Sequence, residues 1–328
     1  MARPCDIDPE VARRKRSAPR FGVYRPTQQD AFLFEGTESA DAGERVRIAT
    51  WNIHFGAGST LDDARRFPKT TVEAHLSAIG DVLRREKVDI VALQEVDRDS
   101  QRSGHIDQLE VLRHATGLTH ASFATTWDAA WVPYPVTAPP RQQYGRMWSG
   151  QAVLSRFPIV EQRRHGLAQP ARNGRFYNRF YLHRCIQQVV LELGRQRQLT
   201  LLNVHLEAFD MANRRSQARG LARLMRRVPQ PAITLGDLNT VPVEATHRSV
   251  FDDEPETDFH GDDTLPTLLE AGWRTVGDDS FTFPAANPSR RLDHILGGPG
   301  VRLDGGGLMS EGGPPSSDHL PLICELTL

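Results

Sequence analysis

Short apolar runs alternate with amphipathic stretches along most of the chain. The segments VRIATWNI (46–53) and DIVALQEV (89–96) are rich in β-branched residues, and apolar runs of this length are typical of buried strands. Between them, apolar residues recur on one helical face at Val72, Leu76, Ile79 and Leu83. Thr70 and Glu73 have the spacing of a capping box at the start of that helix. The pattern predicts a strand, a helix and a second strand.

Hydrophobic spacing predicts the remaining elements in the same way. A second helix carries Ile106, Leu109 and Leu112 on one side and is expected to end near Gly117. Consecutive apolar runs, which favour antiparallel pairing, follow at 151–157, 186–193 and 198–207. Two more helices are predicted at 212–228 and 267–273, the first with arginines on its polar side. The last two strands are predicted at 291–296 and 320–328. Strands with helices outside them indicate an α+β sandwich.

The first part of the chain has a different character. Residues 1–43 mix charges and prolines with few apolar residues, which predicts a flexible arm, and the aromatics of 21–34 predict that this part docks. Residues 44–328 are expected to form one domain. Two stretches without periodicity, 128–148 and 252–266, are predicted to be long surface loops.

Composition narrows the choice of partner and compartment. The formal net charge is −1, so no global field draws the protein to nucleic acid or to an anionic membrane. Nearly all basic residues are arginine, which fits either bidentate phosphate recognition or a coding bias. The three scattered cysteines indicate neither a disulfide framework nor a zinc cluster. Because no secretory signal or anchor follows the basic N-terminus, a cytoplasmic location is expected.

Polar residues with metal-binding and acid–base chemistry lie where these apolar runs end. The set comprises Asn52, Glu95, His205, Asp237, Asn239, Asp293, Asp318 and His319. Strand ends gather at one rim of a sheet, where pockets form. Four carboxylates at one rim need a cation to remain ionised together, and oxygen ligands without cysteine favour a hard ion such as Mg²⁺ or Mn²⁺. Such an ion completes its shell with water and phosphate, which predicts phosphoester chemistry.

Individual roles follow from the chemistry of each side chain. Glu95 is the first candidate metal ligand, whereas Asp97 is expected to be solvated. Asp237 is expected to orient or deprotonate the attacking water, and Asn239, two residues on, to donate to a phosphoryl oxygen. These roles predict a site that activates water next to a bound phosphate.

The histidines are expected to divide between the site and the core. His319 is expected to hold a phosphate oxygen or accept a proton, with Asp293 as the carboxylate that orients it. His205 is expected to donate to the phosphate or its leaving group. His294 is expected to pack or lie at the surface, and no partner can be named for His54. Charge and location alone suggest two further phosphate contacts, Arg146 and Arg184.

Seven of these motifs occur in an order that resembles a known superfamily. WNIHFG, LQEVD, GQAVLSRFP, NVHLEA, GDLN, RLDHIL and SDHLP are similar, over residues 45–328, to the endonuclease/exonuclease/phosphatase superfamily. The resemblance implies a four-layered α/β/β/α sandwich of two mostly antiparallel sheets with helices outside. It also implies a Mg²⁺-dependent (or Mn²⁺-dependent) site and in-line attack of water on a phosphodiester or phosphomonoester.

The resemblance also assigns roles by position. It implies that Glu95 is the chief metal ligand, with Asn52 close to both metal and phosphate, and Asp318 a second metal-side carboxylate. Asp237 is implied to position the water, and Asn239 to hold the phosphate in the transition state. His205 stands where exonuclease III-type enzymes have a tyrosine, so the sequence resembles the sphingomyelinase and deoxyribonuclease I branches more.

Three functions are consistent with the sequence. The first is a hydrolase of a phospholipid-like or small phosphodiester, favoured by the near-zero net charge and the absence of lysine-rich stripes. A nuclease acting on DNA or RNA is the second, and a non-catalytic binding module is the third. The aromatic segment 127–135 would touch a lipid, stack on bases or simply pack. Nothing in the sequence indicates an obligate protein partner.

Overall fold

The computed structural model describes residues 23–36, 42–43, 45–62, 66–194, 196–276, 280–313 and 315–327. Its first sheet has seven strands in the order β1-β4-β5-β3-β2-β13-β12. These strands are β1 (Ala31–Phe34), β2 (Arg45–Asn52), β3 (Ile90–Asp97), β4 (His120–Val132), β5 (Gly145–Ser155), β12 (Arg302–Leu308) and β13 (Leu322–Thr327).

A second sheet has six strands in the order β10-β11-β9-β8-β7-β6. These are β6 (Ile159–Gly166), β7 (Cys185–Glu192), β8 (Gln198–His205), β9 (Ala232–Asp237), β10 (Arg274–Val276) and β11 (Asp293–Gly297). The pairs β2–β3 and β8–β9 are parallel, and the other strand pairs among the described residues are antiparallel. This confirms the predicted two mostly antiparallel sheets.

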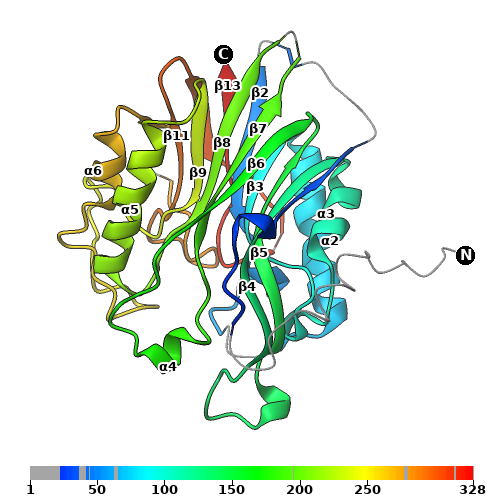
Figure 1. Cartoon of the computed structure of the whole chain (residues 1–328), viewed down its shortest axis with the longest axis vertical. Coiled ribbons are helices and arrows are strands. Elements are labelled where there is room, and N and C mark those ends of the chain that lie inside the picture. The colour runs from blue at the N-terminus through cyan, green and yellow to red at the C-terminus, as the bar shows by residue number, and fades with distance from the viewer. Residues whose placement is uncertain are drawn as a thin grey trace, which may run out of the picture.

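Helices cover the outer face of each sheet, which confirms the four-layered sandwich (Figure 1). The first sheet carries α2 (Lys69–Arg85) and α3 (Gln108–Thr116), and the second carries α5 (Met211–Met225) and α6 (Thr264–Leu269). A short helix, α4 (Arg175–Asn178), lies at the end of the molecule where the strands β8 and β9 finish.

Three apolar layers hold these four layers together. Strand β2 shows why, because its side chains alternate: Ala49 and Trp51 face α2 and α3, whereas Val46 and Ile48 face the second sheet. Leu202 and its neighbours on the second sheet pack against α5 and α6. Burial of this apolar surface is the main force that fixes the sheets and thereby the positions of the polar strand ends.

The helices and long loops depart from the sequence expectations in three places. The capping box is wrong, because Pro68 is the N-cap of α2 and no side chain caps the helix. Residues 128–132 and 145–148 extend β4 and β5, so the predicted long loop shrinks to the hairpin 133–144. Strands β4, β6, β10 and β12 were not predicted. The sequence of β6, IVEQRRHG, is largely polar, and this strand lies between β5 of the first sheet and β7 of the second along the chain.

Part of the N-terminal segment docks on the domain. Residues 31–34 form β1 and pair with β4, and the backbone N–H of Val23 donates to the carbonyl oxygen of Arg179 at 2.8 Å. The predicted flexible arm falls largely on residues 1–22, which lie outside the described residues. Within the described part of the chain, no helix is both long and apolar enough to cross a membrane.

Candidate active site

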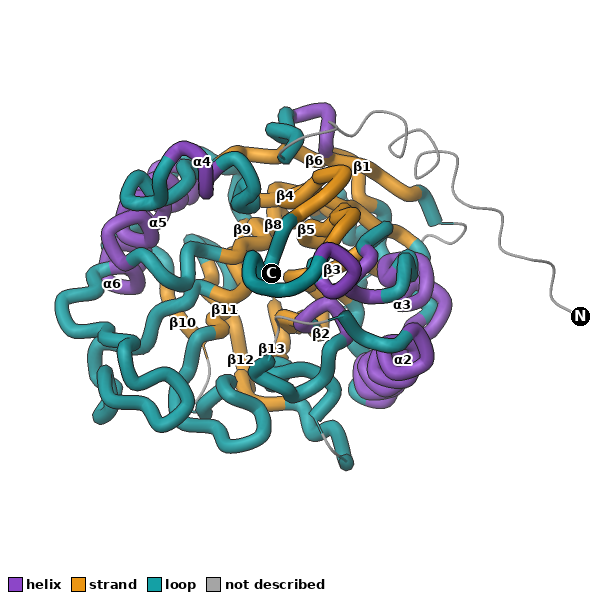
Figure 2. Tube along the Cα trace, turned by 90° about the horizontal axis from the view of Figure 1, so that it is seen from below, coloured by secondary structure: helices purple, strands orange, loops and turns teal. Residues whose placement is uncertain are grey.

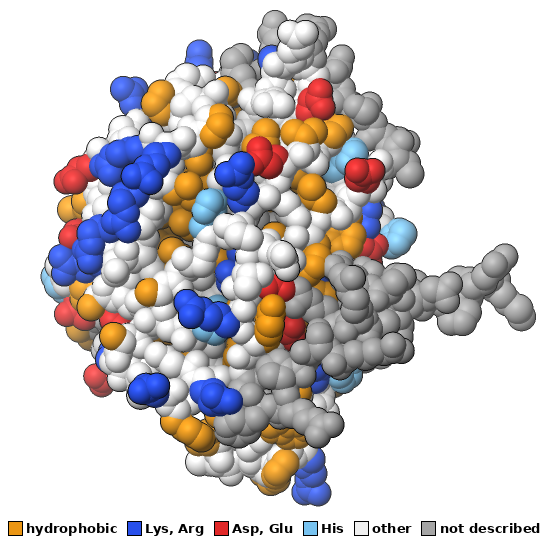
Figure 3. Space-filling view, viewed as in Figure 1, with side chains coloured by type: hydrophobic (Ala, Val, Ile, Leu, Met, Phe, Trp, Pro, Cys, Tyr) orange, Lys and Arg blue, Asp and Glu red, His pale blue; other side chains and the backbone are white. Residues whose placement is uncertain are grey.

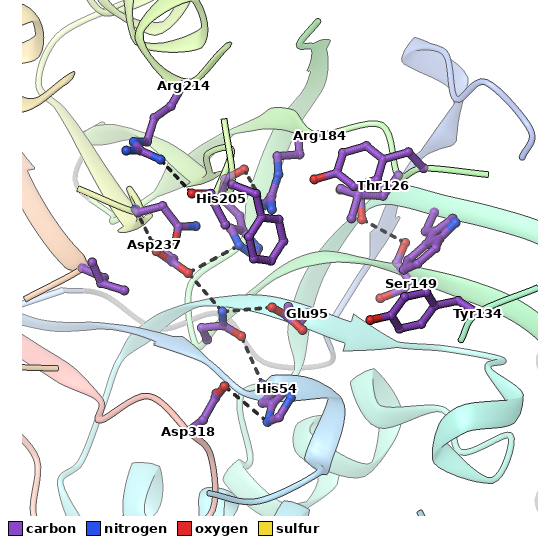
Figure 4. Close-up of a pocket in the computed structure, with 18 of the residues that line it drawn as sticks. His54, Glu95, Thr126, Tyr134, Ser149, Arg184, His205, Arg214, Asp237 and Asp318 are labelled. Carbon is purple, nitrogen blue, oxygen red and sulfur yellow. Dashed lines mark hydrogen bonds and ion pairs between the residues drawn. The ribbon is translucent and has the colours of Figure 1, made fainter. Parts of the chain in front are cut away.

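Two βαβ units bring the polar strand ends to one edge of the sandwich. In β2-α2-β3 the relevant residues are Asn52 and Glu95, and in β8-α5-β9 they are His205 and Asp237. Carboxyl ends of parallel strands point the same way, so each unit presents its pair at the same edge. Figure 2 looks onto this edge, and Figure 4 shows the side chains converging there.

Asn52 joins the two units. Its Nδ2 donates to Glu95 Oε1 at 3.2 Å and to Asp237 Oδ2 at 3.1 Å. Its Oδ1 accepts from the backbone N–H of His54 at 3.1 Å, which leaves one lone pair of that oxygen for another partner. A single buried amide thus fixes the distance between the carboxylates of the two sheets.

Two of the site residues depend on unusual backbone conformations. Glu95 lies at a register shift between β3 and β5 with φ 56°, and Asn239 has φ 50°. The left-handed region is uncommon for residues with a Cβ and occurs often at functional sites. Strand β9 ends at Asp237, so Asn239 reaches the cavity through a turn and not by the alternation expected from the sequence.

His319 and Asp293 form a buried ion pair, as the sequence predicts. His319 Nδ1 lies 2.8 Å from Asp293 Oδ2, and its Nε2 lies 3.7 Å from Asp237 Oδ2. Burial opposes the charge of the imidazole, but Asp293 and Asp237 outweigh it and raise the pKa of His319 to about 10. At neutral pH His319 is therefore a cation whose Nε2–H is directed towards Asp237.

The pKa of the Asp237 carboxyl group lies near neutral pH. Burial raises its pKa to about 7, against the opposing charge of His319 and with a further contribution from Asp293. His205 Nε2 lies 3.4 Å from Asp237 Oδ2. Burial, with the charges of Arg184 and His319, lowers the pKa of His205 well below its ordinary value. His205 is thus a neutral neighbour, and Asp237 is able to exchange a proton near pH 7.

Glu95 and Asp318 are two carboxylates on the other side of Asn52 from the pair Asp293–His319. Burial opposes ionisation of Glu95, but the neighbouring His54 and Arg102 outweigh it and lower its pKa. Burial raises the pKa of Asp318, and the charge of Glu95 adds to this rise. Two partly buried carboxylates that repel each other, next to the remaining lone pair of Asn52, form a donor set that suits a hard divalent cation.

A second group of potential ligand atoms, on Asp237, Asp293 and His319, lies within 4.8 Å of one another. Here the imidazole is already hydrogen-bonded to Asp293 and carries a proton, and a protonated nitrogen has no lone pair for a metal. The two groups therefore differ in chemistry: one contains an ion-paired imidazole, and the other, Glu95, Asp318 and Asn52, offers only oxygen donors.

The sequence suggested no partner for His54. In the structure it lies on the same side of the site as Glu95 and Asp318. It is buried, lines the cavity, and its Nδ1 lies 3.1 Å from the carbonyl oxygen of Gly58 and 3.5 Å from Asp318 Oδ2. Its backbone has φ 44° within a turn that ends at Gly56. The two-residue spacing from Asn52 was the only signal in the sequence.

The two candidate arginines have different positions. Arg184 is buried beside the cavity, where its Nη1 donates to the carbonyl oxygen of His205 at 3.3 Å and its Nε lies 3.6 Å from Glu207 Oε2. Arg146 does not line the cavity: its Nη1 binds Asp128 Oδ1 at 2.6 Å. Arg146 therefore forms an ion pair with a buried carboxylate and does not contact the cavity as predicted. The sequence gave no sign of this pairing.

Three expectations about neighbouring residues are corrected or confirmed. Asp97 is not solvated: it is fully buried, and both its oxygens accept from Arg102 at 3.0 Å. His294 does pack, with Nε2 2.9 Å from the carbonyl oxygen of Thr240. Asp293 begins β11 instead of ending a strand, yet it reaches the same edge because β11 runs antiparallel to β9 with Asp293 opposite Asp237.

The cavity in front of these residues has a volume of about 960 Å³. One wall, residues 172–181, carries Phe176 and Tyr177 with exposed side chains. The opposite wall, residues 253–258, is acidic. Tyr134 and Trp127 lie on a third side, where the hairpin 133–144 begins, so the segment 127–135 contributes partly exposed aromatics to the rim.

Solved structures share this fold at low sequence identity. A protein from Beutenbergia cavernae described as an endonuclease/exonuclease/phosphatase is 23% identical, with a TM-score of 0.65 over 87% of this chain and 72% of that one. A mannosyl-6-phosphatase from Bacteroides thetaiotaomicron is 16% identical, with a TM-score of 0.53 over 86% of this chain and 100% of that one. D. rerio TDP2, complexed with a single-strand DNA product, is 16% identical, with a TM-score of 0.53 over 87% of this chain and 100% of that one.

No curated protein matches the chain significantly. A sequence model of the Endonuclease/Exonuclease/phosphatase family, however, matches residues 49–319 and so spans every site residue described above. This family supports a phosphoester hydrolase activity, and the donor set on its own suits a divalent metal. Fold, motif order and the convergence of the site residues agree, and the chain belongs to the endonuclease/exonuclease/phosphatase family.

Proposed function

We propose that the protein hydrolyses a phosphodiester in a phospholipid-like or small substrate, with a bound divalent metal and in-line attack of water. The observation that carries this proposal is the position of Asp237. Its carboxylate lies between a protonated His319, a neutral His205 and the amide of Asn52, and has its pKa raised to about 7. A carboxylate in these surroundings suits the activation of water at neutral pH.

Mg²⁺ or Mn²⁺ would be held by Glu95 and Asp318, with Asn52 contributing its remaining lone pair. When bound, such an ion neutralises phosphate charge and stabilises the charge that develops during displacement. Asn52 has the further task of holding Glu95 and Asp237 in register. The two N–H groups of Asn52 bind one carboxylate each, so a shift of Glu95 on metal binding would also shift Asp237, the proton acceptor.

The remaining side chains orient the phosphate and move protons. Asp237 takes a proton from the attacking water, and His319 donates its Nε2–H to a phosphoryl oxygen while Asp293 stabilises its charge. Asn239 supplies one N–H, since the other donates to the carbonyl oxygen of Leu206 at 3.0 Å. Arg184 adds positive charge next to His205. Asp237, Asn239, Arg184 and His319 line the cavity, whereas Asp293 is buried and acts through its contact with His319.

The walls of the cavity favour a small or lipid headgroup phosphodiester over duplex nucleic acid. Exposed carboxylates of Glu256 and Asp258 line one wall, and they would repel the second strand of a polyanion. Exposed aromatic side chains on the other wall provide apolar contact for a substrate with a hydrocarbon or aromatic part. A chain of phosphates crossing the cavity would meet the acidic wall, whereas a single phosphodiester need not.

The test is hydrolysis of bis-p-nitrophenyl phosphate, p-nitrophenyl phosphate, sphingomyelin, phosphatidylcholine and DNA, first with EDTA and then with added Mg²⁺ or Mn²⁺. We expect metal-restored turnover of diesters, lost in Asp237→Asn and His319→Gln. The matched controls are Asp81→Asn, an exposed carboxylate on α2, and His165→Gln on β6. Absence of turnover and of metal binding by calorimetry would refute the proposal; turnover of DNA alone would replace the substrate with nucleic acid.

A further inference from the structure

Helix α5 carries a concentration of positive charge that the proposed reaction does not use. Residues 211–228 contain six arginines and no carboxylate. By comparison, α2 balances its basic residues with Glu73 and Asp81. The net charge of the whole chain is only −1, so the positive charge of this helix is a local feature. Surfaces usually intersperse charges of both signs, and this helix does not.

Two of the six arginines serve the fold and four face solvent. Arg214 is buried, with Nε 3.0 Å from Asp262 Oδ2, and Arg215 pairs with Asp263 at 2.5 Å. The others are exposed, and none of the ion pairs among the described residues involves them: Arg219, Arg223, Arg226 and Arg227. These four residues are named here the α5 cationic face, and Figure 3 shows blue side chains gathered over α5.

The start of α5 adjoins the rim of the cavity, and the α5 cationic face follows along the later turns of the helix and its end. Arg172 lines the cavity, and its Nε lies 3.2 Å from Oδ2 of Asp210, the residue that caps the start of α5. The rim at this point exposes Phe176 (73%) and Phe209 (70%). Figures 1 and 2 both place α4 next to α5. Helix α5 therefore connects the exposed aromatic tips, which lie near its start, with the exposed arginines of its later turns and its end.

The shape of this surface points to a planar partner. Within the described residues, the cavity lining includes none of the four arginines, and they stand on the outer, convex side of a helix. Single-stranded nucleic acid is usually held in a positively charged groove with stacking platforms along it. A convex row of arginines beside protruding apolar tips instead resembles an interfacial surface, in which the cations meet anionic headgroups and the apolar tips enter the boundary.

We propose that the α5 cationic face docks the enzyme on a membrane surface that contains anionic phospholipid. This inference rests on the proposed function, since it would place the cavity mouth, beside Phe176 and Phe209, against the layer that holds a lipid substrate. Docking and hydrolysis use separate residues, because the four arginines do not touch the residues around Asp237. Each property is therefore measurable without the other.

The experiment is co-sedimentation of the full chain with vesicles of phosphatidylcholine alone and of phosphatidylcholine mixed with phosphatidylserine. A triple variant, Arg219→Glu/Arg223→Glu/Arg227→Glu, is compared with a control of equal charge change at exposed positions far from α5, Arg84→Glu/Arg85→Glu/Arg302→Glu. Melting temperature and hydrolysis of soluble bis-p-nitrophenyl phosphate check that each variant is folded and active.

We expect the natural chain to bind the mixed vesicles, and to release them as salt rises. The α5 triple variant should bind them about 100-fold less tightly, at roughly a fivefold loss for each of the three arginines, while the control binds normally. Equal binding by the two triple variants, or no binding by the natural chain, would overturn the docking surface. So would loss of single-stranded DNA binding in the α5 variant without any vesicle binding. Failure of the proposed function has a different signature: vesicle binding without hydrolysis of the soluble diester.

Discussion

The units β2-α2-β3 and β8-α5-β9 share one topology but present different chemistry at the same edge of the sandwich. The first ends in Asn52 and Glu95, and neighbouring cationic groups lower the pKa of Glu95 despite its burial. The second ends in His205 and Asp237, and burial there keeps the histidine neutral and raises the pKa of Asp237 to about 7. Two units of one topology thus shift the pKa of their strand-end carboxylates in opposite directions, and this contrast separates the proposed metal side of the site from the proposed proton-transfer side.

The largest expected effect comes from removing the proton acceptor of the second unit. Asp237→Asn keeps the size of the side chain but removes its basicity, so we expect kcat to fall about 10³- to 10⁴-fold on a soluble diester. Metal binding, measured by calorimetry, should change much less because Glu95 and Asp318 remain. An equal collapse of metal affinity and turnover would show that Asp237 is a metal ligand and would erase the contrast between the units.

The converse substitution in the first unit is Glu95→Gln. It removes a charged oxygen ligand while retaining the hydrogen bond from Asn52 Nδ2, so we expect metal affinity to fall about 100-fold and excess Mn²⁺ to restore part of the turnover. Calorimetric titration with Mn²⁺ and the metal dependence of kcat measure this effect. The distinction between the units fails if Glu95→Gln binds metal normally.

The pH profile probes the ion pair that serves the second unit. Asp293→Asn removes the nearest negative charge from His319, whose pKa is otherwise raised to about 10 by Asp293 and Asp237 against the effect of burial. The imidazolium should then lose its proton at lower pH, and the alkaline limb of kcat/KM should move to lower pH. We also expect turnover to fall about 10- to 100-fold. An unmoved alkaline limb would exclude His319 as the group that must be protonated.

The smallest expected effect concerns His54, which positions Asp318 in the first unit. His54→Ala removes the imidazole 3.5 Å from Asp318 Oδ2 and should weaken metal binding about tenfold, as is typical for groups that orient a ligand. His165→Gln on β6 is a suitable control. A loss as large as that of Glu95→Gln would promote His54 to a direct ligand, whereas unchanged affinity would leave it a packing residue.

Much of the site was predictable because strand ends are visible in the hydrophobic pattern. Glu95 and Asp237 follow apolar runs that must be buried, and the structure brings them together through Asn52. Partners were not predictable in this way. Asp97 was expected in solvent and Arg146 at the phosphate, yet Asp97 is paired with Arg102 and Arg146 with Asp128, because ion pairing depends on how the loops and strands fold against one another.

The sequence by itself determined the period of the apolar strands and of the main helices, and the residue types available at the strand ends, since these follow from local alternation of polar and apolar positions. Only the tertiary structure decided that β6 separates β5 from β7, that His54 meets Asp318, and that four arginines of α5 stand beside an aromatic rim. The physical reason is that side-chain proximity and pKa depend on packing across sheets, between residues more than a hundred positions apart in the chain.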